Sequence, residues 1–149
     1  MGLEPSCTLM FRDEAVNLIP EWSEEHGAQI LTFAEYIIQN PPAGLDMSGL
    51  DVLVHGHCHQ KALGVAQHTV DAVKNVLGAN AQMIDSSCCG MAGSFGYQSE
   101  TAEVSREMAK CSLPQKLAAP PRITVFLAME FSCAGQIMEV HEGKQVNLP

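Results

Sequence analysis

Cysteine and histidine are the residues of this chain best suited to chemistry, and they are grouped. Among six cysteines in 149 residues, Cys88 and Cys89 are adjacent, and Cys58 lies between His57 and His59. A disulfide between neighbouring cysteines requires a distorted peptide, so Cys88 and Cys89 are expected to point at something other than each other. In a reducing compartment, such thiols are typically metal ligands or redox groups.

The charge and hydropathy of the chain exclude several classes of partner. Eight basic against seventeen acidic residues give a net charge of −9, with no cluster of Lys or Arg, so we expect no binding to nucleic acid or to an anionic membrane surface. No apolar run approaches the roughly 18 residues that span a bilayer, and residues 1–5 lack the features of a secretory signal. We therefore expect a cytoplasmic protein without a transmembrane segment, or one held peripherally at a membrane by its partners.

Hydrophobic periodicity predicts strands and helices that alternate along the chain. The predicted strands are 51–55, 82–85 and 123–127, and the predicted helices are 8–19, 24–39, 62–77, 98–113 and 136–141. This order is typical of an α/β fold with a mostly parallel sheet and crossover helices.

Each of the three predicted strands is followed by cysteine. Cys58 follows the first strand, Cys88 and Cys89 follow the second, and Cys133 follows the third. Sites on open α/β sheets lie beyond the carboxyl ends of the strands, so these four thiols can converge on one point although they are far apart in sequence. Their spacing resembles neither a zinc ribbon nor the bacterial ferredoxin run. We predict that they are metal ligands.

The three histidines near Cys58 alternate along the chain. On a continuing strand, His55, His57 and His59 would share one face. They could bind zinc together with Cys58, hydrogen-bond to the ligands of a metal centre, or simply meet solvent. His59 is the best candidate for a metal-site residue because it flanks Cys58.

Cys111 is expected to have a structural role. It lies on one predicted helical stripe with Val104 and Met108, which predicts a core position. Core positions are likewise predicted for Met10, Met83, Met108 and Met138.

Two similar segments, EPSC at residues 4–7 and EFSC at residues 130–133, each open a predicted helix. If Cys133 ends one cysteine-bearing unit, Cys7 can end a preceding unit whose strands lie upstream of Met1. Cys7 is then either a ligand of that neighbouring unit or an unpaired thiol.

Several segments resemble the CCG cysteine-rich domain. They are SSCCGMAGSFGY at 86–97, VHGHCH at 54–59 and CAGQ at 133–136. This domain occurs in heterodisulfide reductase, in the iron–sulfur subunit of glycolate oxidase, and at the C-terminus of FAD-linked oxidases of D-lactate dehydrogenase type. The last group is the most similar, since its C-terminal part carries EPSC-like, HxHCHQK-like and DSSCCGMAGSFGY-like segments in the order found here.

The resemblance implies two tandem CCG repeats that hold iron–sulfur centres and pass electrons between a flavin or upstream clusters and an acceptor. Residues 1–42 would be the tail of a preceding CCG repeat with connecting helices, and residues 43–149 the CCG cysteine-rich domain. Cys58, Cys88, Cys89 and Cys133 would ligate the cluster of this domain, of 4Fe-4S type, and Cys7 would belong to the preceding repeat.

The same resemblance implies that FAD lies only in parent domains that are not in this chain. The partners would be upstream FAD and ferredoxin-like domains or subunits of the parent oxidoreductase. The chain is therefore expected to be part of an FAD-linked oxidoreductase and not to be catalytically complete alone.

Two other functions remain open from the sequence. Zinc has no redox chemistry and prefers four nitrogen or sulfur ligands, which the same four cysteines supply, so the chain could be a structural or assembly module. A thiol–disulfide enzyme using Cys88 and Cys89 is the third alternative, although neighbouring cysteines pair poorly.

Overall fold

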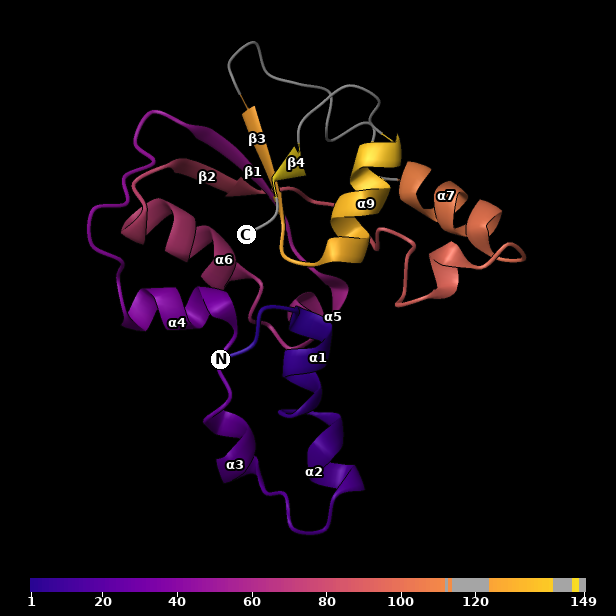
Figure 1. Ribbon diagram of the computed structural model, residues 1–149, viewed down its shortest axis with the longest axis horizontal. Coiled ribbons are helices and arrows are strands. Elements are labelled where there is room, and N and C mark those ends of the chain that lie inside the picture. The colour runs from indigo at the N-terminus through magenta and orange to yellow at the C-terminus, as the bar shows by residue number, and fades with distance from the viewer. Residues whose placement is uncertain (112, 114–123, 141–145, 148–149) are drawn as a thin grey trace.

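The core of the protein is a parallel β-sheet with helices on both faces. The computed structural model describes residues 1–111, 113, 124–140 and 146–147, and in this part of the chain the strand order is β2-β1-β3-β4 (Figure 1). The strands are β1 (Asp51–His55), β2 (Asn80–Met83), β3 (Thr124–Ala128) and β4 (Val146–Asn147). All of the strand pairs are parallel. The predicted α/β class with a mostly parallel sheet is confirmed.

The two faces of β1 pack against different helices. Val52 and Val54 belong to one core cluster, which also holds residues of α6 (Gln67–Asp71) and of the π-helical turn η1 (Ala72–Val76). Leu53 belongs to the other cluster, with residues of α7 (Ala102–Lys110) and α9 (Phe131–Val140). Alternate residues of a strand point to opposite faces, so this short apolar run is buried on both sides. Helices α4 and α6 lie on one side of the sheet and α7 and α9 on the other (Figure 1).

The path of the chain changes direction at β1. From β1 the chain continues to β2 on one side, and it then returns to β3 on the other side of β1. Open α/β sheets bind their ligands beyond the carboxyl ends of strands at such a reversal. The fold thus marks the ends of β1 and β3 as the place for a site.

Each of the two predicted N-terminal helices is in fact two helices. Residues 8–19 contain parts of α1 (Pro5–Met10) and α2 (Glu14–Leu18), and residues 24–39 contain α3 (Glu24–Ala28) and α4 (Phe33–Gln39). Thr32 caps α4 in a capping box with Glu35, and the Glu35 carboxylate also binds the Arg12 guanidinium at 2.6 and 2.9 Å. Tertiary contacts at both breaks therefore override the helical periodicity.

The prediction of one helix over 62–77 is also wrong in its details. Helix α5 (Cys58–Ala62) begins earlier, and Gly64, with φ of +71°, separates it from α6. The end of the segment is as predicted, since Gly78 has φ of +80°. Strand β2 begins two residues before the predicted 82–85, and α9 begins five residues before the predicted 136–141. Ile123 and His141 lie outside the described residues.

No helix in the described part of the chain is long and apolar enough to cross a bilayer.

Helix α7 buries a different face from the one its apolar stripe predicts. Val104, Met108 and Cys111 are exposed, whereas Ser105 and Ala109 are fully buried. The reason is that the glycine-rich loop packs closely on this helix, since a Cβ at Gly90 would collide with the Ser105 carbonyl oxygen. Only small residues therefore fit where the loop and the helix meet. The core prediction for Cys111 is therefore wrong. It is also wrong for Met10, Met108 and Met138, whose side chains are exposed.

Candidate metal centre

Four cysteines gather at the carboxyl ends of the three longer strands. Cys58 opens α5 directly after β1, Cys88 and Cys89 follow β2, and Cys133 lies in the first turn of α9 after β3. The three strands are parallel and end on the same side of the sheet, so the sheet brings these thiols together. We call these four residues the cysteine centre.

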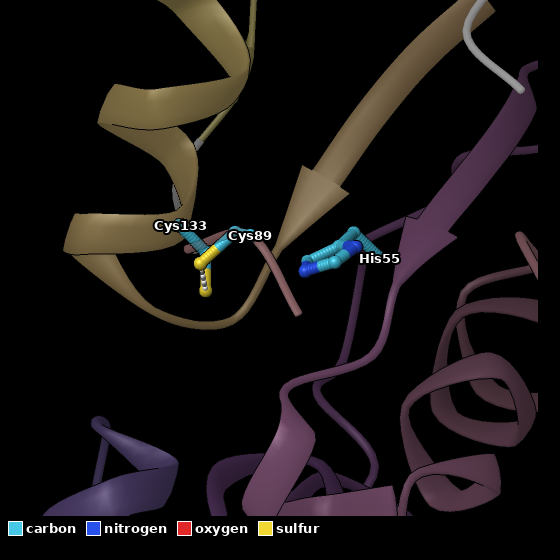
Figure 2. A group of neighbouring side chains, drawn as sticks. All are labelled: His55, Cys89 and Cys133. Atoms are coloured by element: carbon cyan, nitrogen blue, oxygen red, sulfur yellow. Dashed lines mark hydrogen bonds between the residues drawn. The ribbon is translucent and has the colours of Figure 1, made fainter. Parts of the chain in front are cut away.

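The inner part of the cysteine centre is the pair Cys89 and Cys133. Both are buried, and their sulfur atoms are 2.9 Å apart. The His55 side chain, at the end of β1, faces them (Figure 2), and the ligand atoms of the three residues all lie within 4.8 Å of one another. A cysteine, cysteine and histidine at this separation could hold a metal ion.

The outer part of the centre is Cys58 with Cys88. The Cys58 thiol is exposed and that of Cys88 is half-buried. Burial raises the pKa of Cys88, and the neighbouring thiols of Cys89 and Cys58 raise it further, the latter also through a hydrogen bond. The backbone N–H of Gly90 donates to Cys88 Sγ at 3.3 Å and acts in the opposite direction. The centre thus extends from the core to the surface.

The protonation of the inner pair is set by its own contact. The pKa of Cys89 is lowered to about 4, chiefly by the hydrogen bond from Cys133 and further by those from His55 and the Met91 backbone, although burial acts against this. The same hydrogen bond and burial raise the pKa of Cys133. The contact between the two sulfur atoms thus favours the deprotonated form at Cys89 and the protonated form at Cys133. A metal must displace the remaining thiol protons when it binds.

The strand does not continue through the three histidines, so the condition under which they would share one face is not met. Strand β1 ends at His55, and the chain turns into α5 with His57 at its N-cap. His57 is buried, with Nε2 3.3 Å from Glu130 Oε2 and 3.8 Å from Cys58 Sγ. Burial lowers its pKa, although the Glu130 carboxylate counteracts this.

His59 is placed away from the cysteine centre. Its Nε2 lies 3.7 Å from Asp13 and 3.9 Å from Glu14, two half-exposed carboxylates of the N-terminal part. These three side chains form a separate group that could hold a metal ion. His55 and His57, rather than His59, are the histidines beside the thiols. The position of His55 as the last residue of β1 is the sequence signal that points to it.

Cys7 is exposed in α1, and it belongs to neither of these groups. The residues before it nevertheless contact the start of α9. Ser6 donates to the Glu130 carboxylate from its hydroxyl at 2.6 Å and from its backbone N–H at 3.3 Å, and Glu4 accepts from the Phe131 N–H at 3.3 Å. Sequence reasoning did not single out Glu130, although its place in the EFSC segment, matched by Glu4 in EPSC, was a usable signal.

The donor set fits a metal or cluster that takes soft ligands. Four thiols, two of them buried, are the ligands that both iron–sulfur clusters and zinc accept. Backbone N–H groups of Gly90 and Met91 also point at two of the sulfur atoms, which stabilises negative charge there. Cys58, Cys88, Cys89 and Cys133 are therefore able to hold such a group, and His55 and His57 are the nitrogen donors beside them.

Comparison with known proteins relates the chain to oxidoreductases. It is 30% identical over 154 residues to the D-2-hydroxyglutarate dehydrogenase of Escherichia coli K12, and 28% identical over 151 residues to that of Pantoea ananatis. Each alignment covers 100% of this chain and 14% of the relative, so the chain spans about a seventh of the length of these relatives. It is also 33% identical over 57 residues to one subunit of the anaerobic glycerol-3-phosphate dehydrogenase of Escherichia coli K12, which is 38% of this chain and 14% of that protein.

No family model matches the chain, and no solved structure matches it. Membership of the CCG family therefore stays a prediction from the motifs. The chain is homologous to the C-terminal region of D-2-hydroxyglutarate dehydrogenase, is related to the glycerol-3-phosphate dehydrogenase subunit, and carries a cysteine cluster.

Proposed function

We propose that this chain is an iron–sulfur electron-transfer unit of an oxidoreductase. Cys58, Cys88, Cys89 and Cys133 would be the ligands of one cluster of 4Fe-4S type. The observation that carries the proposal is the gathering of thiols from three separate strand ends, with two of the sulfur atoms buried 2.9 Å apart. Cysteine thiolates are the usual ligands of such clusters.

The residues around the thiols have the properties that a redox centre needs. A bound cluster would supply one-electron transfer, and no proton-abstracting base is required for it. The burial of Cys89 and Cys133 keeps water away from one side of the site, while exposed Cys58 leaves the other side near the surface. The N–H groups of Gly90 and Met91 favour additional negative charge on the sulfur atoms.

Residues 1–42 are proposed to be the tail of a preceding CCG repeat, and residues 43–149 the domain that holds the cysteine centre. Support comes from the contacts that the two similar segments make with each other: Ser6 binds Glu130, and Phe131 binds Glu4. Cys7 stands in the first segment where Cys133 stands in the second, so we propose that it is a ligand supplied to the preceding repeat.

The parent enzyme is proposed to be an FAD-linked dehydrogenase of 2-hydroxy acids. This rests on the alignment of the whole chain with two D-2-hydroxyglutarate dehydrogenases. FAD would then lie in other domains, and the upstream FAD and ferredoxin-like domains would be the electron-transfer partners of this chain.

Zinc is the second candidate for the site, because His55, Cys89 and Cys133 alone offer three ligand atoms within 4.8 Å of one another. Anaerobic purification followed by analysis of iron, acid-labile sulfide and zinc separates the two candidates. Iron with sulfide, and a visible spectrum that bleaches with dithionite, is the expected result. One zinc per chain in a colourless protein that iron and sulfide cannot displace would overturn the proposal in favour of a structural module.

The assignment of Cys7 has its own test. If Cys7 serves a preceding repeat, its thiol should react with an alkylating reagent in the native chain at the rate of exposed Cys111, whereas buried Cys133 should be protected. Mass spectrometry of the alkylated peptides measures all three in one sample. Protection of Cys7 to the level of Cys133 would contradict the assignment.

A further inference from the structure

A lysine, a serine and a histidine form a line of hydrogen bonds that ends at the cysteine centre. We infer that Lys61 and Ser86 fix the tautomer of His55, so that His55 donates a hydrogen bond to the Cys89 sulfur and acts as a positioning residue, not as a metal ligand. This inference rests on the proposed function, since its main consequence concerns a redox centre held by Cys89.

The line begins at Lys61, in α5. Lys61 Nζ donates to the Ser86 carbonyl oxygen at 2.5 Å and lies 3.5 Å from Ser86 Oγ. Lys61 Cε also lies close to Gly56, since a Cβ built on Gly56 would be only 3.2 Å from it. The hydrogen bond to the Ser86 carbonyl oxygen thus ties the ammonium group to the segment that leads to Cys88 and Cys89.

The line continues through two buried residues. Ser86 is 8% exposed and His55 is 2% exposed, and Ser86 Oγ is 2.7 Å from His55 Nδ1. Because Nδ1 is engaged by Ser86, the nitrogen that remains for the sulfur atoms is Nε2. Figure 2 shows one ring nitrogen of His55 pointing toward Cys89 and Cys133.

The direction of each hydrogen bond follows from what its two groups can do. An ammonium group can only donate, so Lys61 occupies an acceptor site of Ser86. A cysteine that ligates a metal or cluster is a thiolate, whose sulfur can only accept, so beside such a centre His55 presents an N–H to Cys89 and the hydrogen is on Nε2. Nδ1 then carries a lone pair, which the Ser86 hydroxyl satisfies. For a neutral imidazole, the donors then run in the order Lys61 to Ser86 to His55 to Cys89.

This arrangement has two consequences for the centre. With hydrogen on Nε2 and the Nδ1 lone pair engaged by Ser86, His55 has no free lone pair to offer a metal, so the sulfur atoms remain the ligands. Hydrogen bonds to the sulfurs of a cluster, together with a nearby positive charge, stabilise the reduced form and raise the reduction potential.

The test uses the whole chain reconstituted with iron and sulfide, with the variants Ser86→Ala, Lys61→Met, Lys61→Arg and His55→Gln. We expect iron per chain to be unchanged in all four. At a fixed solution potential, the ratio of reduced to oxidised centre should fall about tenfold in Ser86→Ala and Lys61→Met, which is about 59 mV for a one-electron couple. Lys61→Arg should retain most of the wild-type potential. Lys74→Met, at an exposed lysine of η1, is the matched control and should change nothing.

Two outcomes would overturn the inference. One is the loss of iron in His55→Gln, which would make His55 a ligand, and the other is a wild-type potential in both Ser86→Ala and Lys61→Met. If the wild-type chain takes up no iron and sulfide, the proposed function fails instead. The tautomer can then still be read by ¹⁵N NMR of the metal-free protein, where hydrogen on Nε2 of His55 is expected and hydrogen on Nδ1 would contradict the inference.

Discussion

Glu130 and Ser6 are 124 residues apart in the sequence, yet the Glu130 carboxylate accepts hydrogen bonds from both the hydroxyl and the backbone N–H of Ser6. The contact is reciprocal, because Glu4 accepts from the backbone N–H of Phe131. Each carboxylate thus binds a free N–H at the start of the other segment's helix, where negative charge is favoured. The two similar segments, EPSC and EFSC, tie α1 to α9 at the edge of the cysteine centre.

Removing the Glu130 carboxylate should loosen this junction. Glu130→Gln is expected to lower the free energy of unfolding by about 1–3 kcal/mol. The substitution removes a buried carboxylate, and with it the charge-assisted hydrogen bonds from Ser6 and the contact with His57. Urea unfolding of the metal-free chain measures this. The matched control is Glu139→Gln, whose ion pair with Arg106 is exposed and is expected to contribute less than about 1 kcal/mol. Equal effects of the two substitutions would contradict a structural role for the junction.

Cysteine substitutions separate the proposed ligands from the other thiols. Cys88→Ser should remove most of the bound metal, because a serine hydroxyl is a poor ligand for a site built from thiolates. Cys111→Ser should leave metal content unchanged, since Cys111 is exposed just after the end of α7 and donates to the Glu107 carbonyl. Iron, sulfide and zinc per chain are the measurements. Equal loss of metal in both variants would show that the ligand assignment is wrong.

The sequence predicted the convergence of the thiols because that depends only on topology. A buried run such as Val52 to Val54 defines a strand, and parallel strands end at the same edge, so whatever follows them meets there. The fold class and the gathering of the cysteines therefore follow from local patterns.

The parts that sequence reasoning missed depend on contacts between distant residues. Arg12 and Glu35 meet across 23 positions, and their contact accompanies the breaks in both N-terminal helices. Ser105 is buried because Gly90 packs against its backbone, which turns Val104 outward although it is the more apolar residue. Strand β1 ends at His55 as predicted, but the position of His59 depends on its contacts with distant Asp13 and Glu14, which no local pattern encodes.

The Arg12 and Glu35 contact predicts a dependence of stability on pH. Burial alone would raise the pKa of Glu35, but hydrogen bonds from Arg12 and Thr32 outweigh it and lower the pKa from 4.5 to about 2. A carboxyl group whose pKa is lowered in the folded state stabilises the fold at pH values above its pKa in the unfolded chain. That contribution is lost as the pH falls from about 4.5 to about 2. His68, whose Nδ1 lies 3.1 Å from Glu35, faces the same carboxylate.

Glu35→Gln is therefore expected to be less stable than the wild type at pH 7, by about 1–2 kcal/mol after allowance for solvent screening. The difference should shrink as the pH is lowered through the same interval. Urea midpoints at pH 7, 4 and 3 measure it. Glu107→Gln, which removes only an exposed ion pair with Lys110, is the control. A difference between Glu35→Gln and the wild type that does not change with pH would exclude the carboxylate as its source.

Two glycines in the loop that follows Cys88 and Cys89 offer a matched pair of substitutions. Gly90 and Gly93 both have positive φ, of +92° and +65°, so alanine at either position costs about 1 kcal/mol in backbone strain. They differ in their surroundings: a Cβ at Gly93 would meet nothing within 4 Å, whereas a Cβ at Gly90 would collide with the Ser105 carbonyl. Gly90→Ala should therefore lose a further ~1–3 kcal/mol of stability from overpacking.

The same pair should separate in metal content. Gly90 also donates its N–H to Cys88 Sγ at 3.3 Å, so pushing it away from Ser105 displaces a proposed ligand. Gly90→Ala is expected to bind less metal than the wild type, while Gly93→Ala binds the same amount in spite of its strained backbone. Metal per chain and the urea midpoint of each variant are the measurements. If Gly90→Ala retains full metal content, close packing of this loop on α7 is not what holds Cys88 in the cysteine centre.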